Sequence, residues 1–228
     1  MKFVHIADMH FDTPFRTLSD RANLGQVRRM DQRKTFKKMI EYIKENNIPY
    51  LFIAGDLYEN EYIRESTIKY INNLFKEIPD TKIYITPGNH DPYLKNSYYE
   101  KYNWNNNVKI FTEKLQKVEN SDCNIYGYGF ENFYLKTNQL ENMQIEDKNK
   151  INILITHANL DGSDTSGNEY NNISSRMLKG KGFDYVALGH IHKRDMKTYE
   201  NIVYPGSAVS LGFDELGTHG MVVRKYWK

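Results

Sequence analysis

The feature that most constrains the fold of this chain is a set of five short apolar segments, each followed by polar residues. An apolar run of four to eight residues that ends at polar or turn-forming residues is typical of a buried β-strand. The predicted strands span residues 3–7, 50–54, 82–86, 151–155 and 185–188. Because uninterrupted apolar strands are buried on both faces, they indicate a largely parallel sheet that is covered by other elements.

Helical patterns separate the first three strands. Apolar residues recur at helical spacing over residues 26–46 and 63–78, which predicts two amphipathic helices. The order strand, helix, strand, helix, strand predicts a parallel core. A further strand is predicted at 124–128, and antiparallel strands over 202–204 and 220–227 are expected to close the fold.

Composition limits the class of protein. A length of 228 residues with 39% hydrophobic residues predicts a single domain over 1–228. The net charge of +2 excludes a protein that holds nucleic acid by overall charge alone. The one cysteine, Cys123, allows no intramolecular disulfide and no cysteine-ligated zinc site, and it suits a reducing compartment. With no signal peptide and no apolar run of about 18 residues, a soluble cytoplasmic protein without membrane contact is predicted.

Potential metal ligands follow each of the five predicted strands. Ligands of α/β sheets bind where the loops at the carboxyl ends of the strands converge. The segments are Asp8-Met9-His10, Gly55-Asp56, Gly88-Asn89-His90-Asp91, His157 and Gly189-His190-Ile191-His192. Their mixture of carboxylate, amide and imidazole groups suits Mn²⁺, Fe²⁺ or Zn²⁺ better than Ca²⁺ or Mg²⁺ alone. We predict two divalent metal ions, with Mn²⁺ first and Fe²⁺, Zn²⁺ or Mg²⁺ as alternatives.

The spacing of these residues predicts how they reach a common site. Residues i and i+2 of an extended backbone point the same way, so Asp8 is expected to act with His10, and His190 with His192. The glycines before Asp56, Asn89 and His190 are expected to permit a close backbone approach. Since a shared carboxylate usually bridges two hydrolytic metals about 3.5–4 Å apart, we assign the bridge to Asp56, which lies between the two ligand groups in the sequence.

Parts of this pattern also have a purely structural interpretation. Asp-x-His after a strand is often a hydrogen-bonded turn, and only the combination of five segments favours metal binding. His5 and His219 are predicted to be packed or hydrogen-bonded rather than ligands. The basic face of the first helix, which includes Arg29 and Arg33, is predicted to be solvated rather than in contact with phosphates. Residues 161–172 are rich in Gly, Ser and Asn, and we expect a surface loop over the site.

The ordered set Asp-x-His, Gly-Asp, Gly-Asn-His-Asp, His and Gly-His-x-His resembles the calcineurin-like metallophosphoesterase superfamily, from Asp8 to His192. The resemblance implies an α/β fold in which a two-sheet β-sandwich is flanked by helices, as four αββα layers. It also implies two metal sites that share one ligand. Their ligands would be Asp8, His10, Asp56 and His192 for one metal, and Asp56, Asn89, His157 and His190 for the other.

Finer features resemble the SbcD-like DNA repair exonucleases. They are Asp rather than Glu at position 91, together with Tyr204-Pro205-Gly206-Ser207 and Leu211-Gly212-Phe213-Asp214-Glu215. The Gly-Asp-x-Val-Asp-Arg-Gly and Gly-Asn-His-Glu segments of phosphoprotein phosphatases are missing. The resemblance implies an SbcC-like ATPase partner. Such nucleases usually continue into a capping domain that helps hold DNA, and we expect none within 1–228, which disfavours tight duplex binding.

The predicted reaction is hydrolysis of a phosphodiester bond by a hydroxide that the metals activate. His90 is predicted to stabilise or protonate the leaving oxygen. Asp91 is predicted to orient His90 and to keep it protonated.

A Mn²⁺-dependent exonuclease or endonuclease that acts on DNA is the leading hypothesis. A phosphodiesterase or phosphatase for small molecules is the first alternative, favoured by the modest charge and the missing cap. A non-catalytic metal-binding partner subunit is the second, and the complete ligand set with His90 argues against it. Exonuclease or endonuclease preference and oligomeric state stay open.

Overall fold

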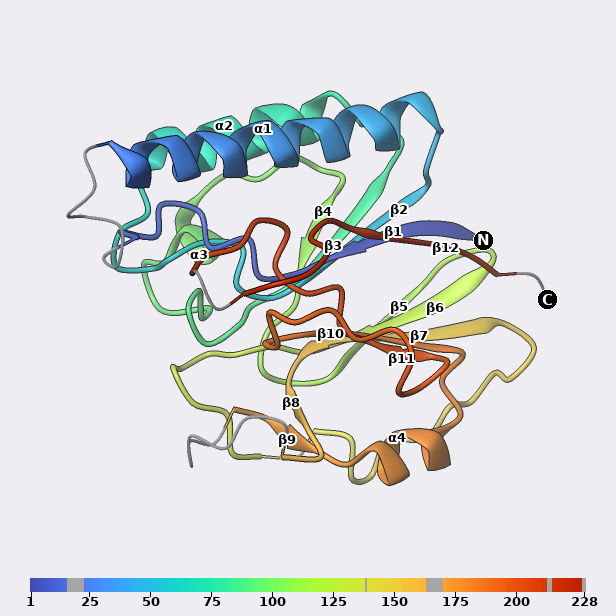
Figure 1. Ribbon diagram of the computed structural model, residues 1–228. Helices are drawn as coiled ribbons and strands as arrows, with labels where there is room; N and C mark the ends of the chain where they lie inside the picture. Colours follow the sequence, from blue (N-terminus) through green and yellow to red (C-terminus); the bar gives the residue numbers. More distant parts are fainter. Residues whose placement is uncertain (16–22, 138, 163–169, 213–214, 227–228) are drawn as a thin grey trace.

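Two five-stranded sheets stack against each other in the computed structural model, which describes residues 1–15, 23–137, 139–162, 170–212 and 215–226 (Figure 1). The first sheet has the order β12 (Val222–Lys225), β1 (Lys2–Ile6), β2 (Tyr50–Ala54), β3 (Lys82–Thr86) and β4 (Val108–Ile110). The second has the order β11 (Ile202–Val203), β10 (Tyr185–Gly189), β7 (Ile151–His157), β6 (Cys123–Gly127) and β5 (Gln116–Glu119). In each sheet one edge strand, β12 or β5, is antiparallel and the other neighbours pair in parallel.

Helices cover the outer faces of the sandwich. Helices α1 (Leu24–Glu45) and α2 (Glu65–Lys76) lie side by side on the first sheet, whereas α4 (Ser175–Lys181) lies on the side of the second (Figure 1). The short helix α3 (Tyr98–Lys101) precedes β4, and β8 (Asn159–Leu160) pairs with β9 (Asn172–Ile173) as a separate ribbon. The architecture therefore has the predicted αββα layers.

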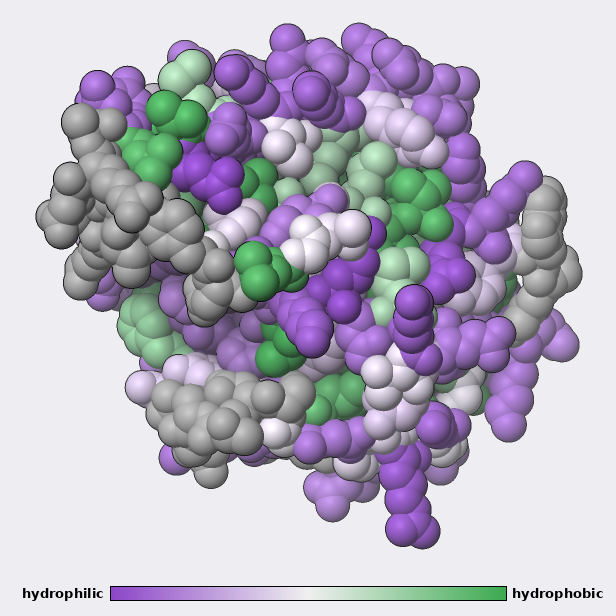
Figure 2. Space-filling view, in the orientation of Figure 1, coloured by the Kyte–Doolittle hydropathy of each residue, from purple (hydrophilic) through white to green (hydrophobic). Residues whose placement is uncertain are grey.

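The side-chain alternation of the strands creates the layers. In β1, Val4 and Ile6 point into a core that they share with Phe36 of α1, because successive residues of a strand face opposite sides. Phe3 points the other way, into a core between the two sheets that also contains Ile153 of β7. A third core lies on the outer face of the second sheet. Most of the viewed surface is hydrophilic, with small separate apolar areas (Figure 2).

The predicted elements are largely confirmed, and one direction is wrong. Strands β2 and β3 have the predicted bounds, and α1 begins two residues earlier than predicted. The tail strand β12 is antiparallel to β1, as expected. Strand β11 was expected to be antiparallel but runs parallel to β10, because the chain after β10 first returns along the sheet and forms an antiparallel bridge between Asp195 and Tyr204. No helix in the described parts of the chain is long and apolar enough to cross a bilayer.

Candidate metal centre

The segments that follow β1, β2, β3, β7 and β10 meet at one edge of the sandwich. Ligand atoms lie within 4.8 Å of one another in three overlapping groups, namely Asp8 with His10 and His192, His10 with Asp56 and His90, and Asp8 with Asp56 and His157. The other two predicted ligands lie beside His157. Oδ1 of Asn89 is 3.0 Å from its Nε2, and the ring centroid of His190 is 5.2 Å from its ring. All seven predicted ligands are thus brought to one site.

Asp56 lies at the centre of this site. Its Oδ2 atom is 3.6 Å from Nε2 of His10 and 3.3 Å from Nε2 of His157. Its Oδ1 atom accepts a hydrogen bond of 2.9 Å from the backbone N–H of His90. The carboxylate therefore lies between His10, which follows a strand of the first sheet, and His157, which ends a strand of the second, as a bridging ligand would.

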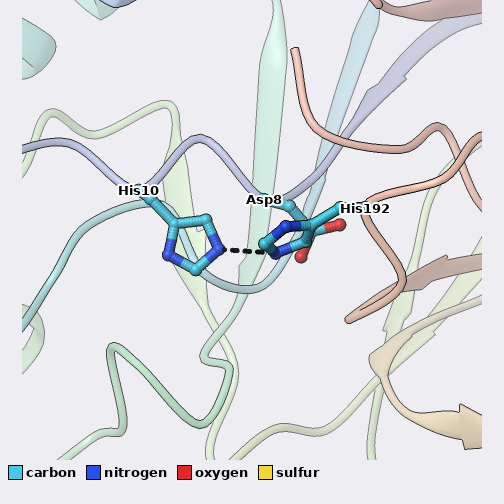
Figure 3. Close-up of side chains that lie close together, drawn as sticks. All are labelled: Asp8, His10 and His192. Carbon is cyan, nitrogen blue, oxygen red and sulfur yellow. Dashed lines mark hydrogen bonds between the residues drawn. The ribbon is translucent and has the colours of Figure 1, made fainter. Parts of the chain in front are cut away.

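The groups around Asp8 fit a cation (Figure 3). Nε2 of His10 and Nε2 of His192 face each other at 3.1 Å. Oδ1 of Asp8 accepts a hydrogen bond of 3.0 Å from the backbone N–H of His190, but its Oδ2 is buried without a hydrogen-bond partner. A buried carboxylate oxygen without a partner is costly unless a cation or donor satisfies it, and imidazole with carboxylate suits a transition metal.

Four residues of the site have a strained backbone conformation. Asp8, His10, Asp56 and His190 have φ angles of 52°, 47°, 52° and 107°, in the left-handed region that costs a non-glycine residue about 1–3 kcal/mol. The prediction that an extended backbone directs Asp8 and His10 is therefore wrong. They converge through tight turns held by hydrogen bonds from the N–H of Asp8 to the carbonyl of Gly55, 3.1 Å, and from the N–H of His10 to that of Asp56, 2.9 Å.

The glycines act as predicted. A Cβ at Gly88 would overlap the Asp56 carboxylate, a Cβ at Gly55 would overlap the ring of His157, and a Cβ at Gly189 would overlap the carbonyl of Ala54. The two sheets can approach this closely at the site only because these positions have no side chain.

Two carboxylates that were given no role from the sequence orient the histidines. Nδ1 of His10 lies 2.6 Å from Oε1 of Glu59, and Nδ1 of His192 lies 2.6 Å from Oε1 of Glu215. Nδ1 of His157 lies 2.9 Å from the carbonyl oxygen of Ala54. Metal-binding histidines almost always place their second ring nitrogen against a carboxylate or carbonyl group, so this pattern is what a metal centre requires.

Glu59 also contacts His90, which corrects the role predicted for Asp91. Nδ1 of His90 is 2.9 Å from Oε2 of Glu59. The Asp91 carboxylate instead accepts hydrogen bonds from the backbone N–H groups of Gly88, Asp56 and Leu57 and from the hydroxyl of Tyr99. Asp91 is completely buried and fixes the loops that carry Asp56 and Asn89, so the orienting contact to His90 comes from Glu59.

Charge pairing dominates the pKa values at this edge. Burial lowers the pKa of His90, but its hydrogen bond to Glu59 and the charge of Asp56 raise it to about 9 overall. Burial raises the pKa of Glu59, but its hydrogen bonds to His10 and His90 lower it to about 2. Burial also lowers the pKa of His157, but the charge and hydrogen bond of Asp56, together with the charge of Asp8, raise it to about 9 overall. At this edge, paired side chains therefore have pKa values that favour their charged forms although burial disfavours charge.

The two histidines that were predicted to be structural have structural contacts. His5 is completely buried, and its Nδ1 lies 2.9 Å from the hydroxyl of Tyr185. Nδ1 of His219 lies 2.9 Å from the carbonyl oxygen of Ser207. Both predictions are confirmed. In the loop predicted over the site, residues 163–169 lie outside the described parts of the chain.

The basic face of α1 divides into two parts. Lys37 forms a surface ion pair with Glu41, as expected for a solvated face. Arg29 and Arg33 instead line a cleft of about 630 Å³ together with Arg64. For these two arginines the choice between a solvated face and contact with phosphates stays a prediction.

A model of the calcineurin-like phosphoesterase family matches residues 1–194. "Uncharacterized metallophosphoesterase YhaO" of Bacillus subtilis (strain 168) is 25% identical over 231 residues, which cover 96% of this chain and 56% of that protein. A subunit of the nuclease SbcCD from Staphylococcus epidermidis is 30% identical over 252 residues, which cover 95% of this chain and 63% of that protein. The chain therefore spans less than two thirds of these curated relatives. A solved structure from Thermus thermophilus aligns over 90% of this chain and 89% of its own, with a TM-score of 0.46 and 11% identity, a similarity too low to carry an argument.

Proposed function

The chain belongs to the calcineurin-like phosphoesterase family of metal-dependent hydrolases, and on this premise we propose that it is a two-metal nuclease that cleaves phosphodiester bonds of DNA. The observation that carries the proposal is the position of Asp56 between His10 and His157, at 3.6 and 3.3 Å. The 30% identity to a nuclease subunit supports a nucleic acid as the substrate class.

The assignment of ligands follows the two halves of the site. One cation would be held by Asp8, His10, Asp56 and His192, and the other by Asp56, Asn89, His157 and His190. Two divalent cations supply an activated water molecule and neutralise the negative charge of the phosphate oxygens. Mn²⁺ is proposed as the metal, because the ligands mix imidazole with carboxylate and amide oxygens.

His90 is the proposed acid. Its side chain is 45% exposed, so it is accessible to a bound ester, and its raised pKa of about 9 keeps it protonated at neutral pH. Protonation of the leaving oxygen by such a group typically contributes about 10²–10⁴-fold to the rate. Glu59 holds the ring through Nδ1, which leaves Nε2 available for the leaving group.

The arginine cleft favours a substrate longer than a simple ester. Asp12, which follows His10 by two residues, pairs with Arg33 at 3.2 Å. No ion pair involves Arg29 or Arg64 within the described residues. Guanidinium groups that line a cleft with Asp12, two residues after the proposed ligand His10, suit the phosphates that flank a scissile bond.

The relatives and the composition support further proposals. Because one relative is a named subunit of a nuclease complex, we propose an SbcC-like ATPase as partner. We further propose that residues 1–228 form a single catalytic domain. The buried free thiol of Cys123 suits the reducing conditions of cytoplasm.

A phosphodiesterase for small molecules is the second candidate. It is favoured by the net charge of only +2, which provides little attraction for a long polyanion.

The substrate assay separates the two candidates. The purified protein is supplied in turn with Mn²⁺, Mg²⁺, Zn²⁺ and Fe²⁺, and its hydrolysis of single-stranded DNA is compared with that of bis-p-nitrophenyl phosphate and cyclic nucleotides. We expect the highest kcat/KM for DNA with Mn²⁺. A higher kcat/KM for a cyclic nucleotide would replace the nuclease proposal with the second candidate.

A further inference from the structure

A second cleft, of about 330 Å³, opens next to the proposed acid and has one aromatic wall. It is lined by Glu59, Asn60, Glu61, Asn89, His90, Phe133, Tyr134 and Tyr170. Asn89 and His90 belong to the proposed catalytic centre, whereas the three aromatic residues have no part in it. Whatever occupies this cleft must therefore lie within contact distance of the reacting groups.

The aromatic wall presents ring faces to solvent. Phe133 is 41% exposed and Tyr134 is 51% exposed, and both lie on the same short loop. The ring of Tyr134 stacks on Tyr170 with a centroid distance of 5.8 Å and an interplanar angle of 14°. Tyr170 in turn lies 5.0 Å from the ring of His190, so a row of rings leads from the cleft to a proposed metal ligand.

Hydrogen bonds fix this wall to the metal centre. The backbone N–H of Asn171, next to Tyr170, donates to the carbonyl of Leu135, next to Tyr134, at 2.8 Å. The side-chain amide of Asn171 donates to the carbonyl of His157 at 2.8 Å. The aromatic wall is thus preorganised relative to the metal ligands, and a ligand that stacks on it would bind with little ordering cost.

The acidic residues of the same cleft indicate which part of a substrate fits. Glu59 and Glu61 also line the cleft, and carboxylates there disfavour a phosphate group. A flat, neutral group is favoured instead, because it can stack on the rings and offer polar edges to Asn60. The nucleobase is the part of a nucleic acid with this chemistry.

We propose that this cleft binds the base of the nucleotide next to the scissile phosphate, stacked on Phe133 and Tyr134. The substrate is therefore a strand whose base is unpaired at the cleavage position, since a base inside a duplex has both faces covered. This inference rests on the proposed nuclease function. Stacking of one base on aromatic side chains changes affinity by about 5- to 150-fold.

The test compares cleavage of two strands, one with a base and one without a base at a single position. The substrates are two single-stranded pentanucleotides that differ only in an abasic tetrahydrofuran residue beside the cleaved bond, assayed with Mn²⁺. The wild-type protein should cleave the strand with the base about 5- to 150-fold more efficiently in kcat/KM. The double variant Phe133→Ser, Tyr134→Ser should lose this preference, and Phe133→Trp should keep it. The control Val223→Ser, at an exposed position of β12, should leave it unchanged.

A binding measurement keeps the two proposals separable. Pentanucleotides with 2-aminopurine at the 5′ or the 3′ end are bound in the presence of Ca²⁺, under conditions in which no cleavage is detected. Quenching of 2-aminopurine by the wild-type protein and its loss in the double variant would support the stacking site. Two results would overturn the stacking site while leaving the nuclease proposal intact. One is equal cleavage of the pentanucleotides with and without the abasic residue, and the other is 2-aminopurine quenching that survives in the double variant. Base-dependent quenching without cleavage under any metal would overturn the nuclease proposal alone.

Discussion

His5 and His157 are both completely buried, but their surroundings shift their pKa values in opposite directions. His5 lies in β1, and burial lowers its pKa to about 3. His157 ends β7 at the edge of the sandwich, where burial also lowers the pKa but the charge and hydrogen bond of Asp56 and the charge of Asp8 together raise it to about 9. The pKa of the same side chain is thus lowered between the sheets and raised at their edge, where neighbouring carboxylates favour positive charge.

The difference teaches where this fold tolerates charge. The layer between the sheets pairs His5 with the neutral hydroxyl of Tyr185, as a medium of low polarity requires. The edge instead gathers the buried carboxylates of Asp8, Asp56 and Asp91. Variants at the edge should therefore impair metal binding and turnover, and variants between the sheets should impair stability.

The largest effect is expected for Asp56→Ala. Loss of the central carboxylate should empty both halves of the site and reduce turnover on the order of 10³-fold or more, since metals supply several kcal/mol to such reactions. Elemental analysis of the purified variant and its kcat/KM on single-stranded DNA test this. Asp80→Ala, at an exposed position, is the matched control. Two tightly bound metals in Asp56→Ala would exclude the bridging role.

His90→Ala should separate chemistry from metal binding within the edge itself. Because His90 is assigned as the acid rather than as a ligand, the variant should keep its metal content and lose about 10²–10⁴-fold in kcat. Metal content and kcat are measured on the same preparation. Full turnover would refute the assignment, and loss of metal would make His90 a ligand.

Glu59→Gln is expected to have a smaller effect, because it acts through other residues. The substitution removes the carboxylate that contacts both His10 and His90, and loss of such an outer partner typically costs about 10- to 100-fold in metal affinity or activity. Metal titration and kcat measure the two effects separately. Glu65→Gln, in the exposed first turn of α2, should behave as wild type, and an equally active Glu59→Gln would show that Glu59 does not position the histidines.

Glu59 also illustrates how far the sequence can lead. The seven proposed ligands stand out because rare residue types follow five apolar strands, and the carboxyl ends of parallel strands in a sheet lie at the same edge. A lone glutamate in a polar loop has no such context, so neither its contact to His90 nor the different position of Asp91 was predictable. Left-handed turns at Asp8 and His10 were missed for a similar reason, since they depend on tertiary hydrogen bonds to the β2 loop.

The same limit applies to the fold. Helices α1 and α2 and the central strands have periodic or uninterrupted apolar patterns that suffice to predict them. Strand β11 has only two residues, and its direction is decided by the path of the preceding loop rather than by its own residues. Elements as short as α3 and β8 carry too few residues for any periodicity to appear.

The smallest expected effect tests the other side of the comparison, the layer around His5. Its pKa is about 3 in the folded protein and about 6.5 when unfolded, so below pH 6.5 the unfolded state binds a proton that the folded state excludes. Stability therefore falls as the pH falls, by about 2 kcal/mol between pH 7.5 and 5 from this one group. Other groups titrate in the same range, so the quantity to measure is the free energy of unfolding of wild type minus that of His5→Leu, in chelator at both pH values. The free energy of unfolding of wild type minus that of His5→Leu should be about 2 kcal/mol lower at pH 5 than at pH 7.5. As purified, before chelator is added, His5→Leu should contain as much metal as wild type. A difference that does not change with pH would mean that His5 is not held neutral between the sheets, and the contrast with His157 would then fail.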